Sequence, residues 1–429
     1  MNVQVTAAPA IQPANTSKLA IADGDIHPQR NGAADLFPFL EQRWKEHLQT
    51  FGSRPRQAYQ AGPAYPKSQP NASRRDAWPP EGGRPGSSLS FMQKQLLDEN
   101  NIQLGILNAT GDNGSSFQNR EFGAAVCHAT NLWLEAEWLK EPRLRGSIVV
   151  PFEDTEAAVQ EIERWAGDER FAQVLMVTRT ADPPGQKRYW KIYEAAAAAN
   201  LPVGVHAFGF GGYPVSGSGW PSFYIEDMVG HAQSAQSFLT SLVIEGVFAR
   251  IPNFRLVLIE SGFAWLPSLA WRLDKLWRRL KVETPHLTRA PSEYIRERVW
   301  LTTQPMEEPQ PREHVLDAID WIGWDRLLFA TDYPHWDYDD LTQVLPMPLP
   351  EQKRRDFFFN NAMKLYQRTF TERRALMRTA VQKAEELALD VEDRDRAFID
   401  GDKFARARRQ LVDGGNDMTR HSTLLVRKA

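Results

Sequence analysis

The sequence predicts an α/β protein whose parallel strands close into a (β/α)8 barrel, the TIM barrel architecture. Short apolar segments alternate with helical ones from residue 91 to residue 330, and an earlier apolar segment brings the predicted strands to eight. The strands are apolar throughout rather than alternating, which indicates a sheet covered on both faces. Eight such units favour a closed barrel over an open, doubly wound sheet.

The alternation of strands and helices can be followed along the chain. The predicted strands are 19–22, 102–107, 146–150, 174–177, 201–205, 255–259, 299–302 and 326–330. The predicted helices are 91–99, 119–139, 156–165, 189–199, 235–250, 266–280 and 312–319. No glycine-rich phosphate loop follows any of these strands, which argues against a nucleotide-binding fold.

Three segments depart from the barrel pattern, which belongs to a domain spanning 18–368. Residues 1–17 have no periodicity and are interpreted as an arm. Residues 33–88 are rich in Pro, Gly, Gln and Arg with little helix or strand signal, as is typical of a functional insertion. Residues 369–429 are interpreted as a charged helical extension that packs on the barrel or on another subunit, with a binding tail as the alternative. The insertion and the extension suggest subunit contacts, so we expect a homodimer or a higher homo-oligomer.

Composition limits the classes of function. The chain has 429 residues and a formal net charge of −3, which gives no reason to expect a nucleic-acid or membrane partner. There is no apolar run long enough to span a bilayer and no leader-like N-terminus, so we expect a cytoplasmic protein acting on a small molecule. A single cysteine, Cys127, excludes an internal disulfide and a cysteine-rich zinc site. Any metal must therefore be held by histidines and carboxylates.

Ligand-type side chains follow several of the predicted strands, and in parallel barrels the catalytic groups lie at the carboxyl ends of strands. The first strand runs into Asp25 and His27, whose spacing of two on an extended segment points both side chains the same way. The fifth strand ends at His206 and the eighth at Asp332. Two carboxylates and two imidazoles at the barrel mouth predict a divalent metal site, with Zn²⁺ expected first and Mn²⁺ or Fe²⁺ as alternatives.

Further candidate residues lie near the same mouth. Glu260 follows the sixth strand, and His231 precedes the helix after the fifth strand, from where it can reach the mouth. His335 follows a Tyr-Pro turn, where it contacts substrate, holds the preceding aspartate or satisfies the backbone at the rim. Trp336 is a candidate for substrate contact or for packing at the rim. Arg54, in the insertion, is a candidate for bidentate recognition of a substrate carboxylate, with a solvated surface position as the alternative.

Several motifs of this chain occur together in one known superfamily. They are Asp23-Gly-Asp-Ile-His-Pro28, Arg143-Leu-Arg-Gly146, Leu201-Pro-Val-Gly-Val-His206, Gly246-Val-Phe-Ala-Arg-Ile-Pro-Asn253, Glu260-Ser-Gly-Phe-Ala-Trp-Leu-Pro267 and Leu328-Phe-Ala-Thr-Asp-Tyr-Pro-His335. Over roughly residues 19–367 the chain resembles the amidohydrolase superfamily, in the branch typified by aminocarboxymuconate-semialdehyde decarboxylase and the aromatic-acid decarboxylases. The resemblance implies one metal ion held by Asp25, His27, His206 and Asp332. It also implies that Asp332 acts as a base toward the water that the metal activates.

Two departures from the family pattern bear on the reaction. The fourth predicted strand has no lysine, which many binuclear members carbamylate, so a single metal ion is expected. The family's decarboxylases usually have a proton-handling histidine after the sixth strand, where this chain has Glu260. A carboxylate can take that role if its pKa is raised, or it can orient a metal ligand. We expect a metal-dependent hydrolase of a small carboxylated or aromatic amide, ester or lactone. A non-oxidative decarboxylase of an aromatic or muconate-type acid is the first alternative, and a non-catalytic binding barrel is the second.

Overall fold

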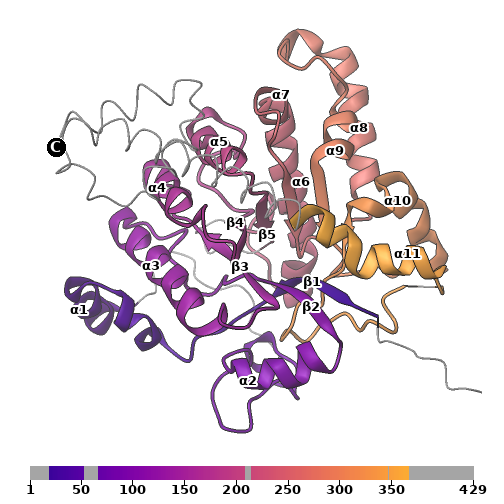
Figure 1. The fold of residues 1–429 in the computed structure, drawn as a ribbon. Helices are drawn as coiled ribbons and strands as arrows, with labels where there is room; N and C mark the ends of the chain where they lie inside the picture. Colours follow the sequence, from indigo (N-terminus) through magenta and orange to yellow (C-terminus); the bar gives the residue numbers. More distant parts are fainter. Residues whose placement is uncertain (1–18, 53–65, 208–213, 346, 367–429) are drawn as a thin grey trace, which may run out of the picture.

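The predicted barrel is confirmed in the computed structural model, which describes residues 19–52, 66–207, 214–345 and 347–366. Eight parallel strands stand in sequence order in one sheet at the centre of the molecule (Figure 1). The strands are β1 (Ile21–Ile26), β2 (Ile102–Leu107), β3 (Leu144–Val149), β4 (Phe171–Val177), β5 (Val203–His206), β6 (Leu256–Ile259), β7 (Val299–Thr302) and β8 (Leu327–Leu328). The arm, Arg54 and the C-terminal extension lie outside the described residues.

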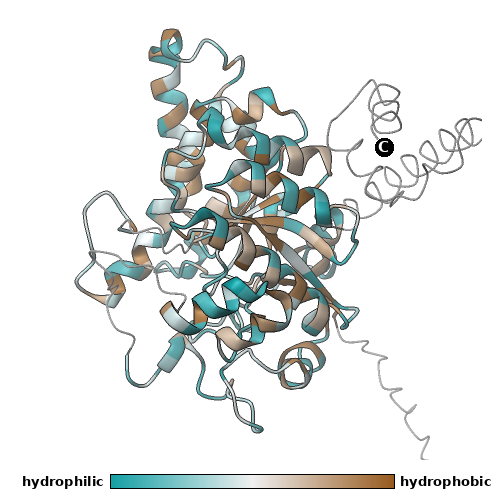
Figure 2. Ribbon diagram, turned by 90° about the vertical axis from the view of Figure 1, so that its left-hand side faces the viewer, coloured by the Kyte–Doolittle hydropathy of each residue, from teal (hydrophilic) through white to brown (hydrophobic). Residues whose placement is uncertain are grey.

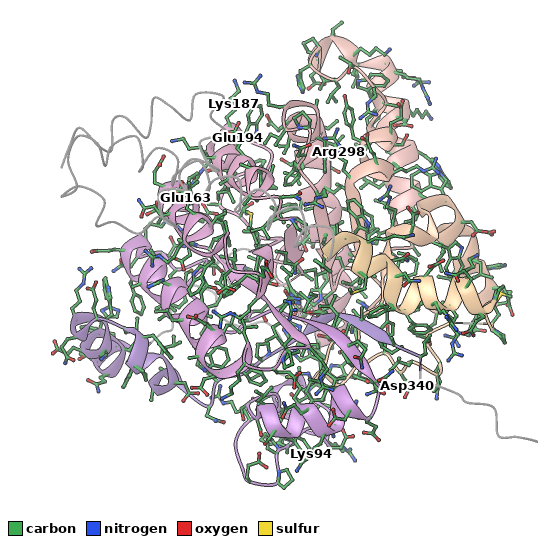
Figure 3. All side chains as sticks on the ribbon, in the orientation of Figure 1. Lys94, Glu163, Lys187, Glu194, Arg298 and Asp340 are labelled. Atoms are coloured by element: carbon green, nitrogen blue, oxygen red, sulfur yellow. The ribbon has the colours of Figure 1, made fainter. Side chains whose placement is uncertain are left out.

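Helices surround the strands on the outside of the sheet (Figure 1). They are α1 (Gln42–Phe51), α2 (Leu89–Met92), α3 (Arg120–Trp133), α4 (Thr155–Trp165), α5 (Trp190–Ala198), α6 (Tyr224–Ile244), α7 (Val247–Arg250), α8 (Leu266–Arg279), α9 (Pro291–Arg298), α10 (Val315–Ile322) and α11 (Glu351–Arg355). Hydrophobic colour gathers on the central strands in Figure 2, and hydrophilic colour is frequent on the outer helices. The exposed Lys94 and Lys187 accordingly lie at the outer edge in Figure 3. None of the helices in the described ranges could cross a bilayer.

Helix starts follow local capping chemistry. Asn119 accepts a hydrogen bond from the backbone N–H of Phe122 at the start of α3, at 3.1 Å. Asp154 accepts one from Ala157 at the start of α4, also at 3.1 Å. Such side chains satisfy backbone donors that have no partner within the first turn of a helix.

A seam between β1 and the segment after β8 closes the barrel. The backbone N–H of Asp332 donates to the carbonyl of Asp25 at 3.1 Å. The carboxylate of Asp23 accepts from the backbone N–H and the hydroxyl of Thr331, at 3.0 and 2.5 Å. The seam therefore places the polar residues that follow the first and last strands side by side.

The amino end of the barrel is closed by a helical segment, residues 361–366, that packs under the strands. Ala362, Leu365 and Tyr366 contact apolar side chains inside the barrel. Those side chains, near the starts of their strands, include Ala22, Leu104, Ala172, Val257 and Leu328. A second, larger apolar cluster lies between the strands and the surrounding helices. The carboxyl end of the strands is thus the end left for a functional site.

The insertion has more regular structure than predicted. The 3-10 turn η1 (Ala33–Phe39) and helix α1 lie within residues 33–88, where little helix signal was expected. Trp44 and Leu48 are buried on α1. Because residues four apart share one face of a helix, this short apolar stripe is enough to hold α1 on the barrel.

Helix α6 begins earlier than predicted, at Tyr224 rather than at residue 235. The sequence predicted that His231 lies before this helix, but the structure places it within the helix. Glu226 accounts for the early start, because its carboxylate accepts from the backbone N–H groups of Ser222 and Phe223 at 2.8 and 2.7 Å. This arrangement satisfies donors that a helix end otherwise leaves unpaired.

Candidate metal centre

Five buried side chains converge at the carboxyl end of the barrel. They are Asp25, His27, His206, Glu260 and Asp332, from β1 and the residue after it, the end of β5, and the segments that follow β6 and β8. His27 Nε2 lies 3.2 Å from Asp25 Oδ1 and 3.0 Å from Asp332 Oδ1. His206 Nε2 lies 2.8 Å from Glu260 Oε2 and 3.3 Å from His27 Nε2. The structure therefore brings together the four predicted ligands and adds Glu260 to them.

Two carboxylate oxygens in this cluster are left unsatisfied. Asp25 Oδ2 and Asp332 Oδ2 are buried and have no hydrogen-bond partner among the described residues, whereas Glu260 Oε2 has the ring nitrogen of His206 beside it, at 2.8 Å. Buried polar atoms without partners cost free energy. The potential ligand atoms form two overlapping groups, and within each group all atoms lie within 4.8 Å of one another. The groups are Asp25, His27, His206 and Glu260, and His27, Glu260, Asp332 and His335. Nitrogen and oxygen donors at this spacing fit one divalent cation.

Burial and mutual charge set the protonation of the cluster in the absence of an ion. Burial lowers the pKa of His206, but Glu260 and Asp25 outweigh burial and raise it to about 9. Burial raises the pKa of Asp25, but His27 and His206 outweigh it and hold that pKa well below its usual value. Burial, followed by the charge of Asp332, raises the pKa of Glu260. At neutral pH a metal ion must therefore displace a proton from His206.

Asn108, directly after β2, holds two of the candidate ligands. Its side-chain Nδ2–H donates to Asp25 Oδ1 at 2.8 Å. Its backbone carbonyl lies 3.0 Å from His27 Nδ1, and because a carbonyl only accepts, His27 carries its proton on Nδ1. Burial lowers the pKa of His27, but Asp25 and Asp332 outweigh burial and raise it well above its usual value, so a metal that binds at Nε2 must displace the proton there. Sequence reasoning missed Asn108 because an amide is not a typical metal ligand, although its place after a strand was a usable signal.

The turn after β8 combines an unusual backbone with a supporting imidazole. Asp332 has φ of 62° and Glu260 has φ of 51°, in the left-handed region that residues other than glycine rarely adopt. Such outliers cluster at functional sites. His335 Nδ1 lies 2.7 Å from Asp332 Oδ1, and its ring stacks on that of His27 with 4.5 Å between centroids. Of the three interpretations of His335, the structure shows the contact that would hold Asp332.

Three more ionisable groups surround the cluster. His231 Nδ1 lies 3.9 Å from Glu260 Oε1, so α6 brings this predicted residue to the mouth. Burial, followed by the charge of Arg179, lowers the pKa of His231 to about 3, which keeps the ring neutral at neutral pH. Burial, followed by Asp332 and Glu260, raises the pKa of Asp337 to about 7. Sequence reasoning assigned no role to Arg179 or Asp337, although both lie shortly after strands.

The insertion borders the mouth next to Trp336. The backbone N–H of Trp336 donates to the carbonyl of Ala72 at 2.8 Å, and that of Arg74 donates to the carbonyl of Pro334 at 2.9 Å. The indole Nε1–H of Trp336 donates to the hydroxyl of Tyr224 at 3.2 Å, and the residue is 37% exposed. Trp336 therefore lies at the rim, where the insertion, α6 and the turn after β8 meet.

The barrel carries a buried cluster of imidazoles and carboxylates that could hold a metal ion, and sequence comparison finds a family of barrel enzymes that the chain matches. The family model described as Amidohydrolase matches residues 22–368. The chain belongs to the amidohydrolase family, as its motifs predicted, and it is an enzyme of that superfamily. The predicted resemblance is therefore confirmed.

Particular relatives share the fold and part of the sequence. The gamma-resorcylate decarboxylase of Polaromonas sp. (strain JS666) is 25% identical over 286 residues, which cover 63% of this chain and 85% of that protein. The same enzyme of Rhodococcus jostii is 25% identical over 269 residues, covering 57% and 77%. The 5-carboxyvanillate decarboxylase of Novosphingobium aromaticivorans, solved with bound manganese, matches with a TM-score of 0.60 at 16% identity, covering 82% of this chain and 98% of that chain. An amidohydrolase of Mycobacterium avium subsp. paratuberculosis matches with a TM-score of 0.60 at 19% identity, covering 82% and 100%.

Proposed function

We propose that the protein is a metal-dependent, non-oxidative decarboxylase of a small aromatic acid that has a hydroxyl group beside its carboxyl. The buried cluster, with its unsatisfied oxygens on Asp25 and Asp332, carries this proposal, because it offers a site for an ion that can hold the oxygens of such a substrate. The decarboxylases among the relatives support the choice of reaction. They reverse the order expected from the sequence, which placed hydrolysis first.

The ligands we assign to the metal are Asp25, His27, His206 and Asp332; their ligand atoms fall in two overlapping groups that share His27 and Glu260. A bound divalent ion would act as a Lewis acid toward the substrate's carboxylate and neighbouring hydroxyl. The sequence favoured Zn²⁺, but carboxylate-rich donor sets also suit Mn²⁺. Two solved decarboxylases of similar fold contain manganese, so we propose Mn²⁺ and Zn²⁺ as the two ions to test.

Decarboxylation breaks the bond between a ring carbon and the carboxylate, releases CO₂ and leaves the bonding electron pair on that carbon, which then takes a proton. Glu260 is the acid we assign to this step. Its Oε2 faces His206 at 2.8 Å, while its Oε1 lies on the side of His231, at 3.9 Å. A buried carboxyl group with a raised pKa can keep a proton available near neutral pH. Glu260 would thus do the work of the histidine that the family's decarboxylases usually have after the sixth strand.

Hydrolysis of an ester, amide or lactone is the second candidate function. Hydrolysis is favoured by the carboxylate after β6, where the family's decarboxylases usually have a histidine. In hydrolysis Glu260 would only orient its neighbours, such as His206. In this reaction Asp332 would take the proton of the attacking water. The hydrogen-bond distance between His335 and Asp332 is compatible with either reaction.

Product analysis separates the two candidates. Protein loaded with Mn²⁺ or Zn²⁺ is incubated separately with 2,6-dihydroxybenzoate, with 5-carboxyvanillate and with a panel of aryl esters and lactones. We expect CO₂ release from an aromatic acid, loss of that activity in Glu260→Gln and partial recovery in Glu260→His. Turnover of an ester or lactone without any CO₂ release would place hydrolysis first, and no turnover of any compound would contradict both candidates.

A further inference from the structure

A chain of buried polar side chains crosses the inside of the barrel below the metal centre. Tyr366 Oη lies 3.1 Å from Gln173 Oε1. Gln173 Nε2 lies 3.0 Å from Ser147 Oγ and 3.2 Å from Asn108 Oδ1. Ser147 Oγ lies 2.7 Å from Asn108 Oδ1, and Asn108 Nδ2 lies 2.8 Å from Asp25 Oδ1. All five residues are 0% exposed, so water does not compete for these hydrogen bonds.

Every donor in this chain points towards the metal centre. The ionised carboxylate of Asp25 can only accept, so the amide of Asn108 must turn its NH₂ group to it and its oxygen away. That oxygen accepts from Ser147 and from the NH₂ group of Gln173, which leaves the Gln173 oxygen to accept from the hydroxyl of Tyr366. Hydrogen bonds aligned in one direction polarise and strengthen one another. The orientation of each amide is therefore fixed by its neighbours.

The surrounding backbone accommodates this chain at two positions. A Cβ atom on Gly204 of β5 would lie 2.7 Å from Gln173 Cδ, so only glycine leaves room there for the glutamine. The register between β3 and β4 shifts after Gly146, which pairs with Phe171, so that Ser147 pairs with Gln173. Polar groups inside an apolar barrel cost free energy unless all of them are hydrogen-bonded. Their presence indicates a role beyond filling the barrel interior.

We propose that Tyr366, Gln173 and Ser147 are positioning residues for the metal centre. Through Asn108 they orient the carboxylate of Asp25, so that the helical segment 361–366 at the amino end of the barrel sets metal affinity at the carboxyl end. This inference rests on the metal centre proposed above, but not on the reaction catalysed there. Removing the Tyr366 hydroxyl leaves Gln173 Oε1 buried without its donor, and the amides can then rotate away from the arrangement that holds Asp25.

The test compares two buried tyrosines. Tyr366→Phe removes the first hydroxyl of the chain, whereas the control, Tyr193→Phe, removes a fully buried hydroxyl that donates to the carbonyl of Pro184 at 2.7 Å, outside this chain. Calorimetric titration of metal-free protein with Mn²⁺ gives the dissociation constant, and thermal unfolding gives the stability of each variant. Groups that support metal ligands typically contribute about 10–100-fold to affinity, so we expect Tyr366→Phe to weaken Mn²⁺ binding about tenfold and Tyr193→Phe to leave it unchanged.

Equal Mn²⁺ affinity in wild type and Tyr366→Phe, or equal weakening in both tyrosine variants, would overturn the proposal. If Tyr366→Phe does not fold, Ser147→Ala provides the same test with a smaller expected weakening, because Gln173 Nε2 still reaches Asn108 Oδ1 directly. Wild-type protein that binds no Mn²⁺ would overturn the metal centre and this inference together. Protein that binds Mn²⁺ as expected but releases no CO₂ would contradict only the proposed function.

Discussion

The two ends of the barrel are built from the same strands but contain opposite chemistry. At the carboxyl end, Asp25, His206 and Glu260 lie buried within contact distance of one another. At the amino end, Ala362 and Leu365 pack on apolar side chains inside the barrel. Buried charge costs stability and apolar packing supplies it, so a site of this kind depends on the remainder of the barrel being well packed. The comparison teaches that changes to the apolar packing at the amino end and changes to the ionisable cluster at the carboxyl end should affect different measurements, with the polar chain from Tyr366 as the proposed link between them.

The largest expected effect is a loss of turnover with little loss of stability. Asp332→Asn keeps the shape of the side chain, and asparagine tolerates the left-handed backbone found at this position. Asp332 is a proposed metal ligand in both candidate reactions and takes the proton in hydrolysis, where loss of such a group typically costs about 10²–10⁴-fold in rate. We expect turnover to fall by about that factor while the thermal unfolding midpoint stays close to that of wild type. Turnover and unfolding are measured on the same preparation. Retained activity would remove Asp332 from the catalytic role.

The pH dependence of metal binding gives the next largest effect. The pKa of His206 is raised to about 9 without a metal, so its ring is protonated at neutral pH and must lose that proton to bind. The apparent Mn²⁺ affinity should therefore rise about tenfold per pH unit for each proton displaced. Titration at several pH values between about 6 and 9 tests this slope. An affinity that does not change over this range would contradict the assignment of His206 as a ligand.

A change in the apolar packing at the amino end should lower stability and leave turnover unchanged. Leu104 packs with Leu365 in the interior cluster, and Leu104→Ala would leave a cavity there. Substitutions of this kind typically cost about 2–5 kcal/mol of unfolding free energy. Denaturant unfolding should show that loss, while turnover per folded molecule stays as in wild type. A marked fall in turnover without loss of stability would mean that the two ends are not separable in this way.

The smallest expected effect comes from replacing two glycines of the insertion, which tests whether the insertion supports the carboxyl end. Gly82 and Gly86 have φ of 95° and 75°, so alanine at either position costs about 1–2 kcal/mol in backbone strain. They differ in their surroundings: a Cβ on Gly86 would lie 2.6 Å from the carbonyl oxygen of His27, whereas a Cβ on Gly82 would meet nothing within 4 Å. We expect Gly86→Ala to lose more stability than Gly82→Ala, because the backbone of His27 must shift, and only Gly86→Ala to weaken Mn²⁺ binding. Equal metal affinity in the two variants would show that the insertion does not position the ligands.

The strands and four of the clustered residues could be predicted because they follow local rules. Asp25, His27, His206 and Asp332 lie at or shortly after the carboxyl ends of apolar strands, and the parallel topology brings all such positions to one end of a barrel. Strands β2 and β7 were predicted with the bounds that the structure shows. Local sequence pattern was therefore sufficient to predict residues that the barrel topology alone brings together.

The remaining features depend on contacts that local pattern does not contain. Asn108 was missed because its importance comes from a hydrogen bond to Asp25, more than 80 residues away. The early start of α6 depends on Glu226 accepting from backbone groups before the helix, which hydrophobic periodicity does not register. The order of the two candidate reactions could not be predicted from Glu260 alone, because a carboxylate at that position is compatible with both.

The seam that closes the barrel has a consequence for the order of folding. Asp23 and Thr331 are 308 residues apart in sequence, yet they share two hydrogen bonds. Contacts over such separations form late, because loop-closure entropy opposes them until the intervening chain is structured. During synthesis β1 must therefore wait for β8, and the ligands on the two sides of the seam meet only when the last strand has docked. Metal uptake by a nascent or refolding chain should then report the completion of the barrel rather than its beginning.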